Sequence, residues 1–471
     1  MPLKQIHFGT SGWRGIIGDD FTFAGVRAAC AAIADCVRKE NPKDPRLIVG
    51  YDTRFLSPEF ARSAVSVLAV RGIHSYLCKE PTPTPAIACE ILRRKTEGGI
   101  NFTASHNPAD YNGLKFSTAD GAPALPRVTQ QLEKLAEKHA QRGVPENGNT
   151  DPSRWEEIDP RDTYLETLAG KVDVAAIQQA GLKIAFDALY GTSAGYLDRF
   201  LRDRGVEVHA LHGQRDVLFG GHPPEPSDDR LGELRQLVQE SGAALGLATD
   251  GDADRFGILD RTGSFISPNH IISLLLDYLL ETRPVWPRGV ARSVATTHLV
   301  DAVARHHNVR VYETPVGFKY IGELIKQNKI TIGGEESAGL TIYGHVPEKD
   351  GILACLLVAE MVARRGASLG EQLQALFAKV GAYYPVRVNL HLSDEERARV
   401  AARIKKDPAK FNGRRVARVD RTDGLKLLFE DDSWVLLRLS GTEPVVRCYC
   451  EAHSQQETQA LVDAAQKFIA E

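Results

Sequence analysis

The sequence has few of the features that mark exported, membrane-bound or nucleic-acid-binding proteins. Its seven cysteines are odd in number, scattered and without a CxxC pair, which predicts reduced thiols in a cytoplasmic protein. The amino terminus lacks a basic segment followed by an apolar core, and the apolar run at residues 271–280 is too short to span a bilayer. The net charge of −3 argues against general nucleic-acid binding, although a phosphate ligand needs only a local basic pocket.

The rest of the composition is that of a soluble globular protein. The chain has 471 residues, 43% hydrophobic and 25% charged, and this length suggests roughly three or four domains. Strand and helix patterns alternate through most of it, beginning with a strand at residues 47–51, a helix from Ser57 and a strand at residues 73–77. Strands follow one another directly only near the end, at residues 415–419 and 424–429. This order predicts three α/β units followed by a small α+β domain with an antiparallel sheet.

The segment at residues 100–108, INFTASHNP, is the centre of the chain's chemistry in our interpretation. An apolar run ends there in a polar loop, which places Ser105 just beyond the carboxyl end of a strand, where open α/β sheets bind ligands. A serine alone in a loop is more often part of a turn. Lys115 would return close to Ser105 if Asn112 and Gly113 form a turn, although a surface lysine is the simpler alternative.

The second unit contains the best candidate for a metal site. After an expected helix at residues 191–205 and a strand at residues 243–249, the sequence DGDADR follows at residues 250–255. Carboxylates at alternate positions of a loop, here Asp250, Asp252 and Asp254, can converge on one hard cation. An EF-hand would need glycine and glutamate where Arg255 and Arg261 stand, so the pattern favours Mg²⁺ over a calcium cage. A solvated acidic turn is the alternative.

Two segments of the third unit favour a phosphorylated sugar. Gly317 and Lys319 lie at a strand-to-helix junction, and both helix amino termini and lysines attract phosphate oxygens. In GGEESAG, at residues 333–339, Glu335 and Ser337 are two apart in an extended loop and can bond neighbouring sugar hydroxyls. The alternative for this loop is a capped turn before a helix.

Other candidates for anion binding lie near the two ends of the chain. The loop FGTSGWRG at residues 8–15 offers backbone amides and Arg14 to a phosphate, with a surface turn as the alternative. Near the other end, RLSGTEP at residues 438–444 and the nearby Arg447 combine two hydroxyls, a glycine loop and two arginines. This combination is typical of an anion clamp.

Five segments together, GTSGWRG, TASHNPADYNGLK, DGDADR, GGEESAG and RLSGTEP, resemble the α-D-phosphohexomutase superfamily over the whole length of the chain. The resemblance implies four domains around a central cleft, at residues 1–155, 156–262, 263–381 and 382–471. The first three would be related α/β domains with mixed sheets, and the fourth a mobile α+β domain with an antiparallel sheet. It also implies a phosphosugar substrate and a monomeric or homodimeric protein.

The resemblance also implies a role for each candidate residue. Ser105 would be the phosphoserine and, with Asp250, Asp252 and Asp254, would bind Mg²⁺, while glucose 1,6-bisphosphate would act as the activator. Lys115, His106 and Arg14 would take part in catalysis, with Lys115 the first choice as general acid or base and His106 the second. The expected substrate-binding residues are Arg255, Gly317, Lys319, Glu335, Ser337, His345, Lys349, Arg438, Ser440, Gly441, Thr442 and Arg447. For His345 and Lys349 a surface position is the alternative.

The expected activity is that of a phosphoglucomutase acting through a 1,6-bisphosphate intermediate. The sequence EES at residues 335–337 looks more like glucose-preferring members, since phosphomannomutases and phosphoglucosamine mutases often carry another residue in the middle position. The alternatives are a phosphomannomutase or dual-specificity enzyme, a phosphoglucosamine mutase and a sugar-bisphosphate synthase. A Mg²⁺-dependent phosphatase and a non-catalytic phosphosugar-binding protein are further alternatives.

Overall fold

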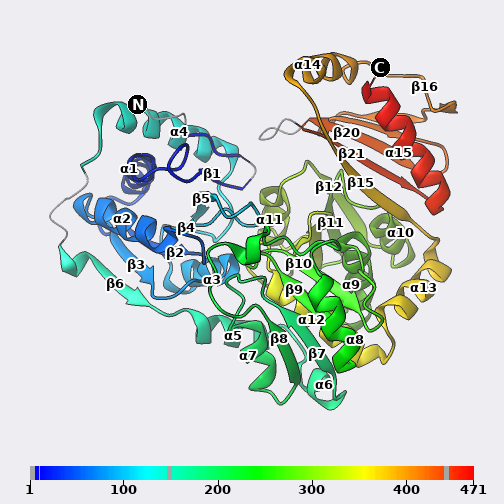
Figure 1. Ribbon diagram of the computed structural model, residues 1–471, viewed down its shortest axis with the longest axis horizontal. Helices are drawn as coiled ribbons and strands as arrows, with labels where there is room; N and C mark the ends of the chain where they lie inside the picture. Colours follow the sequence, from blue (N-terminus) through cyan, green and yellow to red (C-terminus); the bar gives the residue numbers. More distant parts are fainter. Residues whose placement is uncertain (1–5, 10, 146–150, 440–444, 471) are drawn as a thin grey trace.

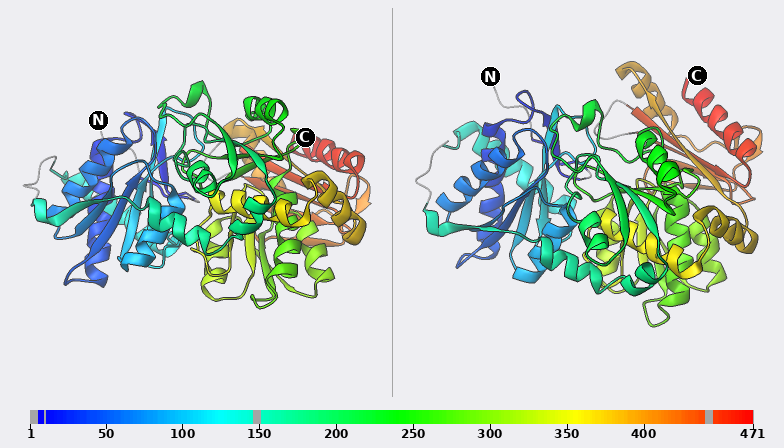
Figure 2. Two further views of the ribbon diagram at one scale, coloured as in Figure 1. Left: turned by 90° about the horizontal axis from the view of Figure 1, so that it is seen from below. Right: turned by 60° about the horizontal axis from the view of Figure 1, so that its bottom comes forward.

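Four large β-sheets, each built from a different stretch of the chain, organise the molecule in the computed structural model (Figure 1). The structure describes residues 6–9, 11–145, 151–439 and 445–470. The blue amino-terminal unit and the orange and red carboxyl-terminal unit lie at opposite ends, and the two middle units lie between them (Figure 2). Within the described ranges, no helix combines the length and the apolar character needed to cross a bilayer.

The first sheet has six strands and contains four neighbouring parallel strands. In sheet order its strands are β1 (Trp13–Ile16), β5 (Tyr111–Thr118), β4 (Gly98–Phe102), β2 (Arg46–Tyr51), β3 (His74–Cys78) and β6 (Trp155–Ile158). The strands β4, β2, β3 and β6 are parallel, whereas β5 runs antiparallel to both β4 and β1. The helices of this unit are α1 (Phe23–Glu40), α2 (Ser57–Val70), α3 (Thr84–Arg94) and α4 (Pro126–Arg142).

The second and third sheets have four strands each and repeat this arrangement. The second runs β10 (Phe256–Asp260), β9 (Leu245–Thr249), β7 (Lys183–Asp187) and β8 (Glu207–Leu211). The third runs β14 (Gly339–Ile342), β13 (Ile332–Glu335), β11 (Gly289–Ser293) and β12 (Arg310–Thr314). In both, the first strand of this order is antiparallel to its neighbour and the other three are parallel.

Helices connect the strands of these two units. The second unit contains α5 (Arg161–Ala169), α6 (Val174–Gln179), α7 (Leu197–Arg202) and α8 (Gly232–Ser241), with short 3₁₀ turns at Pro152–Arg154 and Phe219–Gly221 before and within it. The third contains α9 (Pro268–Thr282), α10 (Leu299–His306), α11 (Phe318–Lys326), α12 (Gly351–Arg365) and α13 (Leu369–Val380). The two units share one hydrophobic core, in which α12 is buried almost all round.

The repeated topology explains why distant sequence segments serve one site. In each α/β unit, one connection joins a parallel strand to its antiparallel neighbour, and these are residues 103–110, 250–255 and 336–338. The three connections carry Ser105, the three aspartates and Ser337, and Glu335 ends the strand before the last of them. All three loops therefore leave the carboxyl end of a parallel strand, the edge at which α/β sheets bind ligands.

The carboxyl-terminal unit has a different architecture. Its sheet is antiparallel throughout, in the order β15 (Tyr384–His391), β21 (Val445–Ala452), β20 (Trp434–Leu439), β19 (Leu425–Leu428) and β18 (Arg418–Asp420). It also contains α14 (Asp394–Arg403), α15 (Gln455–Ala470) and a small hairpin of β16 (Lys410–Phe411) and β17 (Arg414–Arg415). Trp434 and Tyr449 pack against Val294 of the third unit. The expected fold, three α/β units and an antiparallel carboxyl-terminal sheet, is confirmed.

Asn112 and Gly113 lie within β5 and form no turn, although β5 pairs with β4 and so brings Lys115 back beside it.

Two predicted elements also differ from the structure. The helix expected at residues 191–205 is limited to α7. Before α7, Gly191 lies close to the loop at residues 250–255, because a Cβ added to Gly191 would be 2.9 Å from the Asp250 carbonyl oxygen. The strand expected at residues 415–419 is split into β17 and β18, which belong to different sheets. Both errors arise where tertiary packing decides the local backbone.

Gly351, the first residue of α12, sits where the third unit meets the metal loop of the second. A Cβ at Gly351 would lie 2.3 Å from the carbonyl oxygen of Arg255, which is backbone and cannot swing away. We therefore expect Gly351→Ala to lower the free energy of unfolding by about 1–3 kcal/mol, measured by urea denaturation. Gly232→Ala is the matched control, since Gly232 also begins a helix but has nothing within 4 Å of an added Cβ. Equal effects of the two changes would contradict this account.

Candidate active site

Ser105 is buried where the first two units meet. Its side chain is 1% exposed, and its Oγ donates a hydrogen bond of 2.6 Å to Oδ2 of Asp250. The backbone at Ser105 is left-handed, with φ of 55°, a conformation that costs an L-residue roughly 1–2 kcal/mol. The Ser105 amide donates to Oγ1 of Thr103, and Nδ1 of His106 lies 3.3 Å from the Ser105 Oγ. The loop thus holds the hydroxyl toward the second unit.

The three aspartates of the loop after β9 converge as their spacing predicted. Asp250, Asp252 and Asp254 are all fully buried, and one carboxylate oxygen of each lies within 4.8 Å of those of the other two. Burial, and then the charges of Asp254 and Asp252, raise the pKa of Asp250 to about 8. Three buried carboxylates repel one another, so this arrangement requires nearby positive charge.

Two lysines from different units supply part of that charge. The ammonium group of Lys115, on β5, donates to Asp252 at 2.5 Å and to Asp254 at 2.7 Å. Lys349, just before α12, donates to the same oxygen of Asp254 at 2.7 Å. Burial lowers the pKa of Lys115, but the attraction of Asp252 and Asp254 outweighs it and leaves the pKa raised. The alternative of a surface position is therefore wrong for both lysines, which are 6% and 7% exposed.

The carboxylates also retain unused acceptors. Oδ1 of Asp252 and Oδ1 of Asp254 are buried and have no hydrogen-bond partner among the described residues. Oxygen ligands on three converging carboxylates, beside the hydroxyl of Ser105, match the preference of Mg²⁺ for a few carboxylates and room for a phosphate. The residues present therefore fit a magnesium ion.

Further charged and imidazole groups surround Ser105. Arg14, on β1, donates to Oδ1 of Asn107 at 2.5 Å, and burial lowers its pKa to about 10. The guanidinium of Arg255 lies 4.0 Å from Asp254 and 3.7 Å from Glu225. Burial, and then the charges of Arg255 and Arg14, hold the pKa of His106 well below its ordinary value.

The sugar loop of the third unit forms a second group of candidates. Glu335 is 4% exposed and accepts a hydrogen bond of 2.7 Å from the amide of Gly317, which precedes α11. Burial, and then the charge of the neighbouring Glu336, raise the pKa of Glu335 to about 7. Burial lowers the pKa of Lys319, which the charge of Glu335 partly offsets. The strand-to-helix junction and the sugar loop thus meet.

A cavity of about 220 Å³ joins this loop to the carboxyl-terminal unit. Its walls include Arg255 from the second unit, Glu336 and Ser337 from the third, and Arg387 and Tyr449 from the fourth. Ser105 is not among the lining residues, so the cavity lies between the loop at residues 336–338 and the carboxyl-terminal unit. Arg255, which follows the three aspartates in the chain, connects the cavity wall to the loop at residues 250–255.

The structure places His345 differently from the other candidates. Its side chain is fully buried, and its Nε2 lies 2.7 Å from Oδ2 of Asp350. Asp350 caps α12 by accepting from the Leu353 amide, and it also accepts from the hydroxyl of Tyr164. His345 therefore supports the start of α12 at Gly351, which follows Lys349 by two residues. His345 does not line the cavity.

Two residues of the expected anion clamp, Arg438 and Arg447, lie on neighbouring strands of the carboxyl-terminal sheet. Arg438 on β20 faces Arg447 on β21 in the strand register, so both side chains are on the same face of the sheet. The Arg438 guanidinium pairs with Asp423 at 2.9 Å. Ser440, Gly441 and Thr442 lie outside the described residues.

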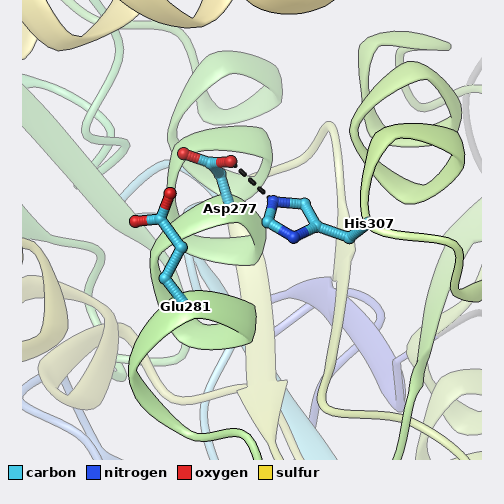
Figure 3. A group of neighbouring side chains, drawn as sticks. All are labelled: Asp277, Glu281 and His307. Carbon is cyan, nitrogen blue, oxygen red and sulfur yellow. Dashed lines mark hydrogen bonds and ion pairs between the residues drawn. The ribbon is translucent and has the colours of Figure 1, made fainter.

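A second group of potential metal ligands lies elsewhere, with two carboxylates on α9 and an imidazole just after α10. Figure 3 shows Asp277, Glu281 and His307, with the imidazole bonded to Asp277. Arg365 donates to both carboxylates, at 2.8 and 2.6 Å, and Lys379 lies 3.7 Å from Asp277. All four carboxylate oxygens of Asp277 and Glu281 already have a basic side chain as hydrogen-bond partner, unlike Oδ1 of Asp252 and of Asp254, so this group is an ion-pair network.

Comparison with known protein families agrees with this geometry. Models described as the α/β/α domains I, II and III of phosphoglucomutase/phosphomannomutase match residues 5–143, 162–263 and 267–380, and the model of the carboxyl-terminal domain matches residues 388–467. The four matches follow the order of the four sheets. The chain belongs to the phosphoglucomutase/phosphomannomutase family. It is a phosphohexomutase of the α-D-phosphohexomutase superfamily, an isomerase that moves a phosphoryl group within a sugar phosphate.

Individual relatives agree on the family and differ in their sugars. The chain is 30% identical to a phosphoglucomutase/phosphomannomutase of Thermococcus kodakarensis, over 98% of each chain. It is 28% identical, again over 98% of each chain, to a Methanosphaera stadtmanae protein that carries the name phosphoglucosamine mutase. A solved structure from Thermus thermophilus, which carries the name phosphomannomutase, is 33% identical over the whole of both chains with a TM-score of 0.86.

Several residues of the site escaped the sequence analysis. Thr84, the first residue of α3, donates from its hydroxyl to Asp252 and from its amide to the Asp252 carbonyl oxygen. Glu348 is 3% exposed next to Lys349, and burial raises its pKa to about 7. Arg54 is fully buried behind the Ser105 loop. None of the three belongs to a recognisable local pattern, although the ThrPro step at Thr84 is a typical helix start.

The raised pKa of Glu335 predicts a pH-dependent effect on stability. The native state holds a proton on this carboxyl more tightly than the unfolded chain does, so stability decreases as the pH rises from about 4.5 to about 7. The loss in the free energy of unfolding is absent below that pH window and reaches about 3 kcal/mol above it. Glu335→Gln should therefore raise the melting temperature relative to wild type more at pH 8 than at pH 5.

Glu166→Gln, at an exposed position of α5, is the control for this comparison. Thermal unfolding across the pH range should show no comparable trend for it. A difference in melting temperature between Glu335→Gln and wild type that stays constant from pH 5 to pH 8 would contradict the raised pKa of Glu335.

Proposed function

We propose that this phosphohexomutase is a phosphoglucomutase, which interconverts α-D-glucose 1-phosphate and glucose 6-phosphate through a phosphoserine at Ser105 and a 1,6-bisphosphate. The observation that carries the proposal is the contact of the Ser105 hydroxyl with a fully buried cluster of three carboxylates. A serine that only shaped a turn would have no need of a buried metal site beside it.

The reaction consists of two transfers with a turn of the intermediate between them. In the first, the bond between phosphorus and the Ser105 Oγ breaks and a bond to the free hydroxyl of the hexose phosphate forms. The hydroxyl proton leaves to a base, for which neutral His106 is the candidate. Lys115, which its raised pKa keeps as an ammonium group, is the candidate acid that protonates the departing Ser105 oxygen. The bisphosphate then turns end for end, and its other phosphoryl group returns to Ser105.

The protein's own groups make this transfer electrostatically possible. Phosphoserine carries about −1.5 to −2 charges at neutral pH and would repel an approaching hydroxyl oxygen. Lys115, Lys349, Arg14 and Arg255 surround the transfer point and offset this charge. Mg²⁺ held by Ser105, Asp250, Asp252 and Asp254 would supply further positive charge to the phosphate oxygens.

The remaining candidates suit the non-reacting part of the substrate. Glu335 and Ser337 offer acceptors and a donor to sugar hydroxyls, and Gly317 and Lys319 stand beside them. Arg438 and Arg447, with the loop at residues 440–442, would hold the distal phosphate in either orientation of the bisphosphate. We assign His345 a supporting role, because its ring is buried against Asp350.

A preference for glucose phosphates is the finer part of the proposal. Glu336, the middle residue of the sugar loop, accepts hydrogen bonds from Ser293 at 3.2 Å and Thr296 at 3.5 Å and lines the cavity. A dual glucose and mannose specificity is the second candidate, because the Thermococcus kodakarensis relative carries both names. Glucosamine phosphates are a third, from the name of the Methanosphaera stadtmanae relative.

Substrate competition separates these candidates. We expect kcat/KM for glucose 1-phosphate, measured with glucose 1,6-bisphosphate and Mg²⁺ present, to exceed that for mannose 1-phosphate and glucosamine 1-phosphate by at least about tenfold. Comparable values for glucose and mannose would establish dual specificity. A preference for glucosamine, or release of free phosphate from every sugar, would contradict the proposal.

Metal binding predicts a change that does not depend on turnover. Mg²⁺ at 100 times its Kd should stabilise the fold by about 2.7 kcal/mol, because only the native state brings the three carboxylates together. Thermal unfolding with EDTA and with Mg²⁺ measures this, and chelation should also abolish the mutase activity. Asp250→Asn should lose most of the Mg²⁺-dependent shift. An equal shift in wild type and Asp250→Asn would place the ion elsewhere.

A further inference from the structure

Arg54 makes an unusually complete set of contacts with the loop that carries Ser105. It lies in the connection between β2 and α2 and is fully buried. Its two terminal nitrogens donate to four backbone carbonyl oxygens, three in this loop and one at the first residue of β5. The acceptors are Ser105 at 2.7 Å, Asn107 at 2.6 Å, Pro108 at 2.7 Å and Tyr111 at 3.1 Å.

The remaining donor fixes the guanidinium itself. Nε of Arg54 donates to Oδ2 of Asp52 at 3.1 Å, and Oδ1 of Asp52 accepts from the Arg54 amide and the Ser57 hydroxyl. All five N–H groups of the guanidinium are therefore engaged. Because the planar guanidinium is fixed in one orientation, the four carbonyl groups can keep their hydrogen bonds to it only in their present positions.

This contact acts on a backbone that is strained at the reacting residue. Ser105 has a left-handed backbone, which persists only where surrounding contacts impose it. Its carbonyl oxygen is held between the guanidinium of Arg54 and Gly251 of the metal loop, where an added Cβ would lie only 2.6 Å away. From the backbone held in this way, the Ser105 side chain reaches Asp250.

The second unit also contacts Arg54. From the loop after β8, Arg215 donates to the carbonyl oxygens of Thr53 at 3.0 Å and of Arg54 at 3.1 Å. The ring of Phe219 lies against the guanidinium, with 4.9 Å between Cζ and the ring centroid. The unit that brings the aspartates thus also supports the arginine that holds the serine loop.

We propose that Arg54 is the positioning residue for Ser105, and that Arg215 and Phe219 couple its placement to the docking of the second unit on the first. The inference rests on the proposed function, because it assumes that Ser105 carries the phosphoryl group. Arg54 does not reach the substrate side of the loop; it acts through the backbone of residues 105–111.

The test separates the rate of transfer from substrate binding. Arg54→Lys keeps the charge but offers three donors without the planar fork, so the loop carbonyls lose part of their support. A misplacement of the nucleophile by about 1 Å costs about 100-fold in rate. We expect kcat of Arg54→Lys to fall about 100-fold with KM changed less than threefold, and the rate of Ser105 phosphorylation by glucose 1,6-bisphosphate to fall in parallel.

Arg365→Lys is the matched control for loss of a bridging arginine. Arg365 donates to Asp277 and Glu281, the carboxylates shown in Figure 3, and ends α12 roughly 20 Å from the beginning of that helix at the site. It should lower the melting temperature and leave kcat unchanged. In Arg54→Gly, added guanidinium ion at millimolar concentration should restore part of kcat, which a general loss of stability would not allow.

Arg215→Met keeps the inference testable if the Arg54 variants do not fold, and it should lower kcat several-fold without raising KM. Arg54→Lys with wild-type kcat, or with a kcat loss matched by Arg365→Lys, would overturn the inference. If Ser105 of the wild-type protein takes no phosphate, the proposed function itself fails. If it does and Arg54→Lys takes it at the same rate, only the role of Arg54 is wrong.

Discussion

Mutual repulsion among three buried carboxylates is the constraint on which this site depends. Asp250, Asp252 and Asp254 have no access to water, so each must meet a proton, a cation or a donor from another part of the chain. Lys115 reaches them from the first unit and Lys349 from the third, while Ser105 and Thr84 donate hydroxyl protons. The same contacts that neutralise the carboxylates bring three units of the molecule together.

Repetition of one sheet topology makes this convergence possible. In each α/β unit the functional loop joins a parallel strand to its antiparallel neighbour, so three copies of one arrangement present Ser105, the three aspartates and Ser337 at corresponding edges. The fourth unit, built on an antiparallel sheet, closes the cavity with Arg387 and Tyr449. A ligand in that cavity would touch parts of the chain that differ by more than 200 positions in sequence.

Much of this could be predicted because it depends on local patterns. Alternating strands and helices predicted the fold, and carboxylates at alternate loop positions predicted that Asp250, Asp252 and Asp254 converge. Arg54 could not be predicted, because its partners are main-chain carbonyl groups, which leave no trace in the sequence. The buried position of His345 was missed for a similar reason, since its partner Asp350 has the ordinary pattern of a helix cap. The roles of Ser440, Gly441 and Thr442 remain predictions, because these residues lie outside the described part of the chain.

The most direct test of the account is the intact mass of the protein after incubation with glucose 1,6-bisphosphate and Mg²⁺, followed by peptide mapping of the modified residue. The account predicts that wild type gains one phosphoryl group at Ser105 and that Ser105→Ala gains none. Ser117→Ala, which changes an ordinary serine on β5 of the same unit, should gain it as wild type does. A phosphoryl group on another residue, or a fully active Ser105→Ala, would contradict the central claim that Ser105 carries the phosphoryl group.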